Sequence, residues 1–277
     1  MGVKTTKRMK AILVIVLSTL LLLLYLCPFF MVVVNSLKTK VEIIKSPLAL
    51  PIKYTIENYI DSFGTMKFTS AFFNSLIITV ISVGIIIIFS SMLAYFLARW
   101  NWKINKIIFV ILVVSMIIPF QALMIPFVKI YGGLNLLNSK WMLCFFYLGF
   151  GLSLATFMYQ GFITGIPIEL EEAAIIDGAS SIQVFLKVIL PLLKPTTITI
   201  AILDVLWIWN DFLLPSLVLV GEDQRTLPLS MFYFFGKYTS DYGMAMAALI
   251  LTIIPIIIFY LLAQKQIIKG VIEGAIK

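Results

Sequence analysis

The sequence predicts an all-α membrane protein that crosses the bilayer six times and carries one long helical hairpin outside the membrane. Of its 277 residues, 61% are hydrophobic and only 12% are charged, and the mean hydropathy is +1.08. Water-soluble domains do not approach these values. Six segments reach the roughly twenty mostly apolar residues that a helix needs to cross the hydrocarbon core. One further segment is long and charged and is patterned as two short helices.

The first apolar run, about residues 11–34, follows a group of basic residues, as the apolar part of a signal peptide does. It is longer than that part and has no small-x-small cleavage site at its end. We therefore expect it to remain as the first span. Residues 35–71 then carry Pro47, Pro51 and Gly64 among polar residues, which predicts an external loop with short amphipathic helices.

Five more apolar runs complete the predicted spans, at about residues 72–98, 106–128, 140–163, 196–219 and 243–264. Six spans place both termini on the same side of the membrane. The sequence thus divides into three expected regions. These are an N-terminal span with its external loop (1–71), a transmembrane core (72–264) and a cytoplasmic tail (265–277).

The basic residues predict which side is the cytoplasm. If the N-terminus is inside, 12 basic residues lie inside and 9 outside, and five of the outside residues are lysines of the long first loop. Basic residues near spans favour the cytoplasmic side, so we expect both termini to be cytoplasmic. The residues counted as inside are Lys4, Lys7, Arg8, Lys10, Arg99, Lys103, Lys106, Lys187, Lys194, Lys265, Lys269 and Lys277.

The charged segment between the fourth and fifth spans, residues 164–195, begins with a predicted short helix. Pro167 suits the first turn of a helix. The acidic residues that follow complement the positive end of the helix dipole. They are Glu169, Glu171 and Glu172. Asp177 and Gly178 then interrupt this helix, and Gly178 permits the positive backbone angle that a tight reversal requires.

A second short helix is predicted to begin at Ser180. Gln183 follows three residues later, which is the spacing of a capping box. Pro191 and Pro195 end this helix, because proline lacks the backbone N–H that an α-helix uses. The segment therefore predicts a helix-turn-helix hairpin outside the membrane.

Residue types that are absent or scattered argue against several kinds of function. The chain has no histidine, which is the commonest general base and transition-metal ligand, and its two cysteines lack metal-ligand spacing. No GxxxxGK[ST] phosphate loop is present. The basic residues lie between apolar runs and not along one face, which argues against nucleic-acid binding. We therefore expect no catalytic residues, no metal and no cofactor.

The hairpin contains a spaced motif. Glu172-Ala173-Ala174 is followed by three residues, Gly178, nine residues, and Val188-Ile189-Leu190-Pro191. This string resembles the EAA loop of ABC importer permeases, whose pattern is EAA, three residues, Gly, nine residues and Ile-x-Leu-Pro. The one departure is Val188 in place of the usual isoleucine. The position between spans four and five also agrees with that family.

The resemblance narrows to the carbohydrate-uptake type, and within it to the smaller six-span permease of the maltose-like systems. It extends over nearly the whole chain. The segments that carry it are 35–40 (NSLKTK), 57–59 (ENY), 74–76 (NSL), 94–95 (AY), 98–99 (AR), 119–121 (PFQ), 125–126 (IP), 209–212 (WNDF) and 225–228 (RTLP).

The resemblance implies a transport subunit, not an enzyme. Such a chain lies in a prokaryotic inner membrane, pairs with a second permease and forms half of the translocation pathway. Each cytoplasmic hairpin docks on one of two ATP-binding subunits, which hydrolyse the ATP, and an extracytoplasmic binding protein delivers a sugar-like solute. The residues expected to couple to the ATPase are Glu172, Ala173, Ala174, Asp177, Gly178, Phe185, Leu190 and Pro191.

The docking itself is expected to combine apolar packing with one charge. Small alanines allow close approach, and the apolar side of the hairpin can fill a groove in a soluble partner. The residues of that side are Ala173, Ala174, Ile182, Phe185 and Leu186. Glu172 is the charged residue expected to meet a basic residue of the ATPase.

Polar residues in the fifth span are candidates for the solute path. An unpaired carboxylate at the bilayer centre costs about 2.5–3.5 kcal/mol, so Asp204 and Asp211 must face a cavity, a partner or an interface. The resemblance implies that Asn210 and Asp211 line the central cavity, whereas a nearby Pro215 favours a simple helix break. Trp209, with Trp207, either stacks on a sugar ring or belongs to an interfacial belt.

Two other classes of function remain open from the residues alone. A proton- or sodium-coupled carrier commonly has duplicated halves and a relay of intramembrane ionisable groups, and this chain shows no evident repeat. A membrane enzyme such as a lipid transferase requires a cluster of acids, histidines or basic phosphate ligands near one interface. The acidic residues of the hairpin are the one such cluster, and the EAA spacing explains them better.

Overall fold

The computed structural model describes residues 2–232, 234 and 241–275, and all regular secondary structure among them is helical. The predicted all-α fold is thus confirmed. The chain divides into two compact units: Met1–Phe68 with Met231–Ile254, and Thr69–Ser230 with Pro255–Lys277. Side chains 1–8 and 267–277 lie outside the described part. They include basic residues used above to orient the chain, namely Lys4, Lys7, Arg8, Lys269 and Lys277.

Four of the described helices are long and apolar enough to cross a membrane, and the number rises to six if each of two bent helix pairs is one span. The four long helices match the predicted spans. They are α1 (Gly2–Ser36), α4 (Phe68–Arg99), α7 (Lys140–Ile163) and α14 (Tyr242–Ala275). The bounds of α7 coincide with the predicted fourth span, 140–163.

The third predicted span is not continuous. Instead of one helix over 106–128, α5 (Lys103–Ser115) and α6 (Phe120–Gly133) meet at an angle of 104°. Pro119 lies at the break with an extended backbone, φ −68° and ψ 136°. Because proline has no N–H to donate and restricts the residue before it, the helix cannot continue through this position.

The fifth predicted span, 196–219, is also interrupted. Helix α11 (Lys194–Asn210) ends where Asp211 takes an extended conformation, and α12 (Leu213–Val218) follows. The Asp211 carboxylate accepts a hydrogen bond from the backbone N–H of Leu213, the first residue of α12, at 2.9 Å, as in an Asx-turn. The polar side chain of Asp211 therefore helps to specify the interruption. A hydropathy pattern does not reveal this, because it registers Asp211 only as one charged residue in an apolar run.

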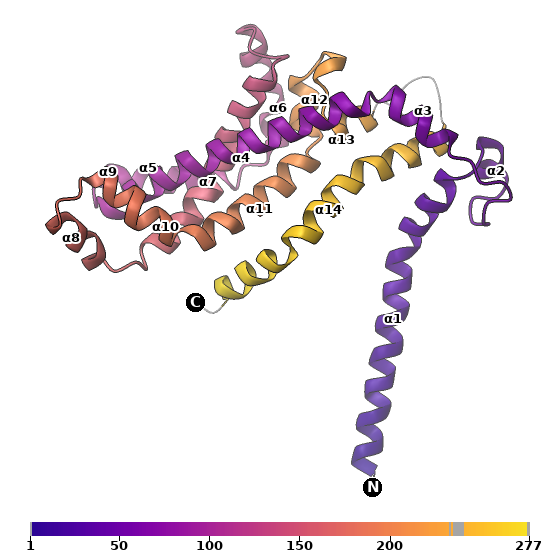
Figure 1. Ribbon diagram of the computed structural model, residues 1–277, viewed down its shortest axis with the longest axis horizontal. Helices are drawn as coiled ribbons and strands as arrows, with labels where there is room; N and C mark the ends of the chain where they lie inside the picture. Colours follow the sequence, from indigo (N-terminus) through magenta and orange to yellow (C-terminus); the bar gives the residue numbers. More distant parts are fainter. Residues whose placement is uncertain (1, 233, 235–240, 276–277) are drawn as a thin grey trace. The chain divides into compact units, whose positions relative to one another are not determined.

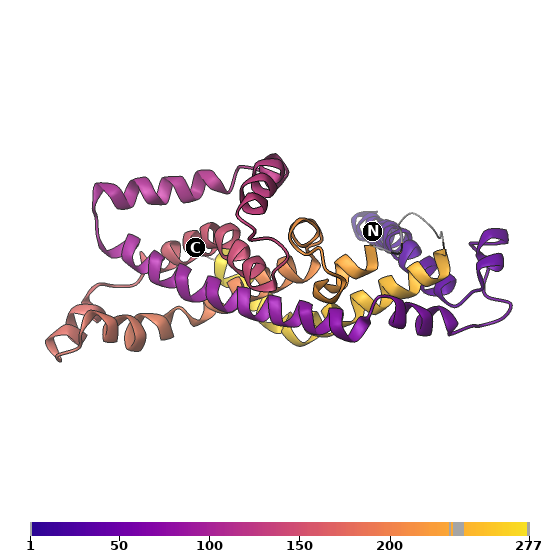
Figure 2. The same cartoon turned by 90° about the horizontal axis from the view of Figure 1, so that it is seen from above.

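The second unit has α7 at its centre, in contact with α5, α11 and α12. Figure 2 shows α4 and α5 leaving a common turn at one end of this unit. The core near α6 is aromatic: Phe146 lies with its ring centroid 4.8 Å from that of Phe127 and 4.6 Å from that of Tyr131. Phe146 and Tyr147 are buried, whereas Phe145 is exposed.

Two of the motif segments meet at the other end of α4. Asn74 donates hydrogen bonds to the backbone carbonyls of Asp223 and Arg225, at 2.8 and 3.0 Å. Ser75 accepts one from the N–H of Leu227 at 2.9 Å. The 74–76 and 225–228 segments, about 150 residues apart in sequence, are thus joined by hydrogen bonds from α4 to one loop.

The first unit contains α1, the short helices α2 (Lys40–Lys45) and α3 (Glu57–Thr65) predicted for residues 35–71, and the start of α14. Lys38 is fully buried, and its ammonium donates to Asn35 Oδ1 at 3.0 Å and to the Ser46 carbonyl at 2.9 Å. Asn58 donates to the carbonyls of Ser36 and Lys38, each at 2.8 Å. This hydrogen-bonded cluster gives the loop after α1 a fixed shape.

Candidate functional site

The candidate site is the helical hairpin of residues 166–193. It consists of α8 (Glu169–Ile176), α9 (Ser181–Val184), the π-helical segment η1 (Phe185–Ile189) and α10 (Leu190–Leu192). Within the second unit, Figure 1 shows α8, α9 and α10 at the end where α4 gives way to α5. The hairpin and this end of α4 are therefore neighbours.

The turn of the hairpin has the geometry that the sequence predicts. Gly178 has φ +87°, in the region that L-residues avoid. The N–H of Ala179 donates to the carbonyl of Ala174 at 2.9 Å, a bond typical of a glycine-terminated helix. Ser180 and Gln183 form the predicted capping box, each side chain bonding the backbone of the other. The turn is thus specified by local residues.

Three side chains fasten the hairpin to α4, and we refer to them as the Glu171 clamp. Arg99 Nε donates to Glu171 Oε1 at 2.5 Å, and the Tyr95 hydroxyl donates to Glu171 Oε2 at 2.8 Å. Arg99 also donates from Nη2 to the carbonyl of Ile166 at 3.1 Å. Glu171 is only 6% exposed. Because both carboxylate oxygens are bonded to one helix, α8 follows the position of α4.

Phe185 belongs to the fastened side of the hairpin and not to its free side. It is buried, and its ring lies 5.3 Å from the ring of Tyr95, centroid to centroid. The expectation that Phe185 fills a groove in a partner is therefore corrected. The reason is tertiary packing: the Phe185 ring lies against Tyr95 of α4 and is covered there, within the same chain. Val184 and Ile189 are buried as well.

The outer side of the hairpin is apolar and exposed. We call four of its large side chains the exposed hairpin residues: Ile175 (56% exposed), Ile176 (84%), Ile182 (71%) and Leu186 (51%). Among the residues expected to couple, Glu172, Ala173, Asp177, Gly178 and Pro191 are exposed, and Ala174 and Leu190 are half-buried. Glu172 has no hydrogen-bond or ion-pair partner among the described residues, so it is available to a partner.

A sharp bend joins the hairpin to α11. The helical stretches Ser181–Leu192 and Lys194–Asn210 meet at 72°, and the residue between them, Leu193, is fully buried. Pro195 stands in the first turn of α11, where a missing N–H costs nothing. The second arm of the hairpin therefore turns directly into the predicted fifth span, with no flexible linker.

Comparison with known families agrees with this geometry. Residues 86–273 match the family described as "Binding-protein-dependent transport system inner membrane component". The chain belongs to this family. It is an inner-membrane permease of binding-protein-dependent transport, as the EAA resemblance implied, and it is a transport subunit, not an enzyme.

Individual relatives of this permease cover nearly its whole length. It is 49% identical over 261 residues to the probable starch degradation products transport system permease protein AmyC of Thermoanaerobacterium thermosulfurigenes, covering 94% of this chain and 95% of the relative. It is 38% identical to the multiple sugar-binding transport system permease protein MsmG of Streptococcus mutans, covering 92% and 93%. Both relatives confirm the prediction of a permease of the carbohydrate-uptake family.

A solved structure shares the fold. The permease superposes with a TM-score of 0.80 on a chain of a bacterial ABC transporter involved in the import of the acidic polysaccharide alginate. The match covers 94% of this permease and 97% of that chain, at 23% sequence identity. At this identity the likeness shows the fold of an ABC importer permease and nothing finer.

The candidate path residues of the permease lie in different surroundings. Asp211 is half-buried and accepts hydrogen bonds from the Tyr147 hydroxyl and from the backbone N–H of Leu213, each at 2.9 Å. Trp209 is 7% exposed, and its ring lies 5.9 Å from that of Phe72. Asn210 is exposed, and its amide donates to the carbonyl of Leu206 at 2.7 Å. Of these three residues, Asn210 is the one whose side chain is exposed.

Sequence reasoning did not identify the members of the Glu171 clamp as interacting residues. In the sequence, Glu171 is one acidic residue in the first turn of a helix, and Tyr95 and Arg99 lie at the end of a span. Their spacing is nevertheless informative, because residues four apart lie on the same face of a helix. An aromatic hydroxyl and a cation on one face at a span end, near an acidic helix start, are together a signal for such a pairing.

Proposed function

We propose that this permease forms one half of the translocation pathway of an ATP-driven importer for a sugar or oligosaccharide, and that its hairpin docks on an ATP-binding subunit. One observation carries the coupling part of the proposal. The hairpin is fastened to α4 by the buried Glu171 clamp, while four of its large apolar side chains are exposed: Ile175, Ile176, Ile182 and Leu186. Movement imposed on these exposed side chains is thus transmitted to α4.

The proposed solute class rests on the relatives. Their names refer to starch degradation products, multiple sugars, and melibiose, raffinose and stachyose. All of these are carbohydrates. A sugar or oligosaccharide is therefore the solute class that we propose for this chain, and an extracytoplasmic binding protein would deliver it.

The proposed docking surface consists of Ala173, the exposed hairpin residues and Glu172. Burial of apolar surface is worth about 25 cal/mol per Å², so large side chains such as Ile176 would supply most of the affinity. The Glu172 carboxylate would pair with a basic residue at the rim, which orients the contact. Gly178 and Asp177 shape the turn between the two arms, and Leu190 and Pro191 support the second arm.

The proposal requires the hairpin and both termini to be cytoplasmic, because ATP-binding subunits lie there. It also requires a second permease to complete the pathway. The division into regions 1–71, 72–264 and 265–277 is part of the same proposal, and residues 276–277 of the tail lie outside the described part.

We further propose that Asn210 contacts the solute, whereas Asp211 shapes the path indirectly. Asp211 uses its carboxylate oxygens on Tyr147 and on Leu213, which leaves little capacity for a ligand. Asn210 retains its amide oxygen, a hydrogen-bond acceptor suited to sugar hydroxyls. Trp209 is packed against Phe72, so a role in stacking on a sugar would require it to move.

The test is reconstitution with defined subunits. The full chain, co-expressed with its neighbouring permease, ATP-binding subunit and binding protein, should hydrolyse ATP faster when the loaded binding protein is added. The purified chain alone should hydrolyse no ATP and move no solute. Solute-coupled proton flux by the chain alone would instead support a secondary carrier and contradict the proposal.

A further inference from the structure

The loop that follows α1 is closed at its base by a backbone hydrogen bond. The N–H of Thr55 donates to the carbonyl of Leu37 at 3.0 Å, so the chain returns to the end of α1 after residues 38–54. Within this stretch, the Glu42 carboxylate accepts a hydrogen bond from the N–H of Ile52. We call residues 38–54 the α1 loop. Because its two ends are joined and its middle is cross-linked, the α1 loop has a defined interior and a defined surface.

The interior of the α1 loop contains a charge. Lys38 is fully buried, and its ammonium donates to Asn35 Oδ1 and to the carbonyls of Ser46 and Pro47. These oxygen acceptors replace the water that a buried ammonium loses. The loop therefore keeps a lysine inside and stabilises it largely with its own backbone.

The surface of the α1 loop, in contrast, carries large apolar side chains. Val41 is the least exposed of them, at 62%, and Ile52 is the most exposed, at 93%. A loop that is surrounded by water normally has the opposite arrangement, with its charges outside. Such a group of exposed apolar side chains indicates contact with lipid or with another protein. The group consists of Val41, Ile44, Leu48, Leu50, Ile52 and Tyr54.

Three exposed lysines distinguish between these two kinds of contact. Lys40, Lys45 and Lys53 are each adjacent in sequence to one of the apolar residues, and none of them forms an ion pair among the described residues. Lysine is depleted in the cores of protein interfaces. At a membrane surface, however, its aliphatic stem lies along acyl chains while its ammonium reaches the phosphates. Tyrosine, here Tyr54, is also enriched at that level. The composition of the loop surface therefore favours lipid.

The position of the α1 loop agrees with contact to lipid. Large apolar side chains of α1, a candidate membrane span, are exposed up to Val33. The polar residues Asn35 and Ser36 follow, and the loop begins directly after them. Because a hydrogen bond joins Leu37 to Thr55, both ends of the loop are held at the end of the span. The headgroup region of the bilayer lies at that level.

We propose that the α1 loop lies in the headgroup region of the membrane and binds anionic phospholipid. Its exposed apolar side chains enter the boundary of the acyl chains, and its three exposed lysines pair with lipid phosphates. The inference goes beyond the proposed function. It requires only that the chain belongs to an inner-membrane family, and the proposed orientation decides which leaflet the loop contacts.

Hydrogen bonds connect the α1 loop to two helices of the first unit. Asn58 of α3 donates to the carbonyls of Ser36 and Lys38, each at 2.8 Å. Ser62, also of α3, donates to the carbonyl of Met244 in α14 at 2.8 Å. A loop that is held at the membrane surface therefore holds the end of α1 and the start of α14 at a fixed depth.

Fluorescence quenching by lipids with brominated acyl chains tests the contact. A bimane probe is attached to Ile52→Cys in the full chain with Cys27→Ala and Cys144→Ala, purified together with the subunits that accompany it. Nanodiscs of phosphatidylglycerol and phosphatidylcholine contain one of the two lipids in brominated form, which measures the relative association of each lipid at position 52. Quenching is expected there and not with Asp61→Cys, which places the probe at an exposed acidic residue of α3.

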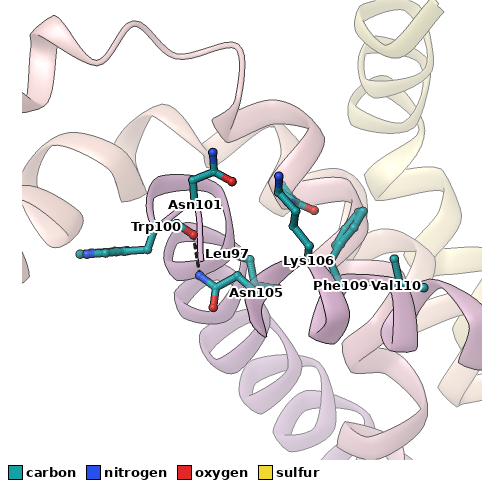
Figure 3. A pocket seen from close by; sticks show the side chains of 8 residues that line it. Leu97, Trp100, Asn101, Asn105, Lys106, Phe109 and Val110 are labelled. Atoms are coloured by element: carbon teal, nitrogen blue, oxygen red, sulfur yellow. Dashed lines mark hydrogen bonds between the residues drawn. The ribbon is translucent and has the colours of Figure 1, made fainter. Parts of the chain in front are cut away.

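The probe at position 52 should report a preference for phosphatidylglycerol at low salt. Lys53→Gln should lower this preference about fivefold, because each lysine near an anionic surface contributes about that factor. Lys53→Arg should restore it. The matched control is Lys106→Gln, which should leave the preference unchanged. Lys106 is also exposed, but it belongs to the second unit, where it lines a cavity of about 330 Å³ with Asn101 and Asn105 (Figure 3).

Absence of quenching at position 52 by either lipid would overturn the proposal. Equal association of the two lipids with the wild-type loop would also overturn it, because the lysines would then not select an anionic lipid. A probe that becomes shielded only when the binding protein is added would show that the loop surface contacts protein and not lipid.

Discussion

Arg99 and Glu171 form a buried ion pair at 2.5 Å between the end of α4 and the first turn of α8, and their side chains are only 12% and 8% exposed. A carboxylate with so little solvent around it depends on its partners for compensation. Tyr95, one helical turn before Arg99, bonds the second oxygen. The pair therefore determines how rigidly the hairpin is joined to the membrane part.

Replacing Glu171 by glutamine should loosen the hairpin without unfolding the spans. Removing one member of a buried pair costs about 3–5 kcal/mol, because the other charge stays buried and uncompensated. We expect a lower Tm and loss of solute-stimulated ATP hydrolysis, with basal hydrolysis retained. Glu172→Gln is the matched control for stability: because Glu172 is exposed, the variant should keep its free energy of unfolding within about 0.5 kcal/mol of wild type, and its Tm should stay close to that of wild type. Equal Tm values for the two variants would contradict the clamp.

Gly178 should be replaceable only by residues that tolerate a positive φ. Nothing lies within 4 Å of a Cβ built at this position, so the cost of a side chain is conformational and not steric. A left-handed conformation costs roughly 1–2 kcal/mol for most residues. Gly178→Val and Gly178→Pro should abolish uptake while membrane insertion stays normal, whereas Gly178→Asn should retain much of it. Uptake by the valine variant at the wild-type rate would show that the turn geometry is dispensable.

Ile182 should contribute to docking and not to folding. It is 71% exposed, and burial of such a side chain in a partner is worth about 1.5–3 kcal/mol. Ile182→Glu should therefore reduce the amount of ATP-binding subunit that co-purifies with the permease by about tenfold or more. Ile52→Glu, at a residue that is 93% exposed outside the hairpin, should leave co-purification unchanged. A similar loss in both variants would point to general misfolding.

Asn210 and Asp211 should give different phenotypes when replaced. Asp211→Ala and Tyr147→Phe remove the same hydrogen bond, so both should lower Tm and impair assembly of the permease. Asn210→Ala should leave Tm near wild type and change the transport rate or the solute preference. Transport kinetics and Tm measured on the same preparations separate the two roles. Wild-type kinetics of Asn210→Ala for every solute carried would remove Asn210 from the path.

The sequence was sufficient to predict the helices and the turn of the hairpin, because these depend on local residues. The apolar runs predict the spans, and Ser180 with Gln183 predicts the capping box that the structure contains. The break at Pro119 could also have been predicted, since proline restricts its neighbours, but the strong hydropathy around it favoured one continuous span.

The contacts between helices that are distant in sequence could not be predicted from local sequence patterns. The sequence shows Glu171 and Glu172 only as acidic residues at the start of one helix, whereas the structure buries Glu171 against Arg99 and leaves Glu172 exposed. Consecutive residues on an α-helix point in directions about 100° apart, so Glu171 can face α4 while Glu172 faces solvent. Phe185 is also buried by a tertiary contact, with Tyr95 of α4, about 90 residues earlier in the sequence, and no local pattern specifies that contact.

The sidedness of the hairpin can be measured directly in intact cells. A single cysteine at Ser180, in a chain with Cys27→Ala and Cys144→Ala, should not react with an impermeant thiol reagent until the membrane is opened. The replaced cysteines matter because Cys27 is exposed in the structure. Labelling in intact cells would place the hairpin outside and reverse the proposed orientation of both termini.

The central claim is that the exposed side of the hairpin contacts an ATP-binding subunit, and photo-cross-linking from Ile176 measures that contact most directly. Ile176 is 84% exposed, so a photoreactive residue there should be tolerated. Irradiation of the assembled complex should join the permease to the ATP-binding subunit from position 176 and not from position 52. Cross-links from position 176 to lipid or to the second permease, with none to the ATP-binding subunit, would contradict the claim.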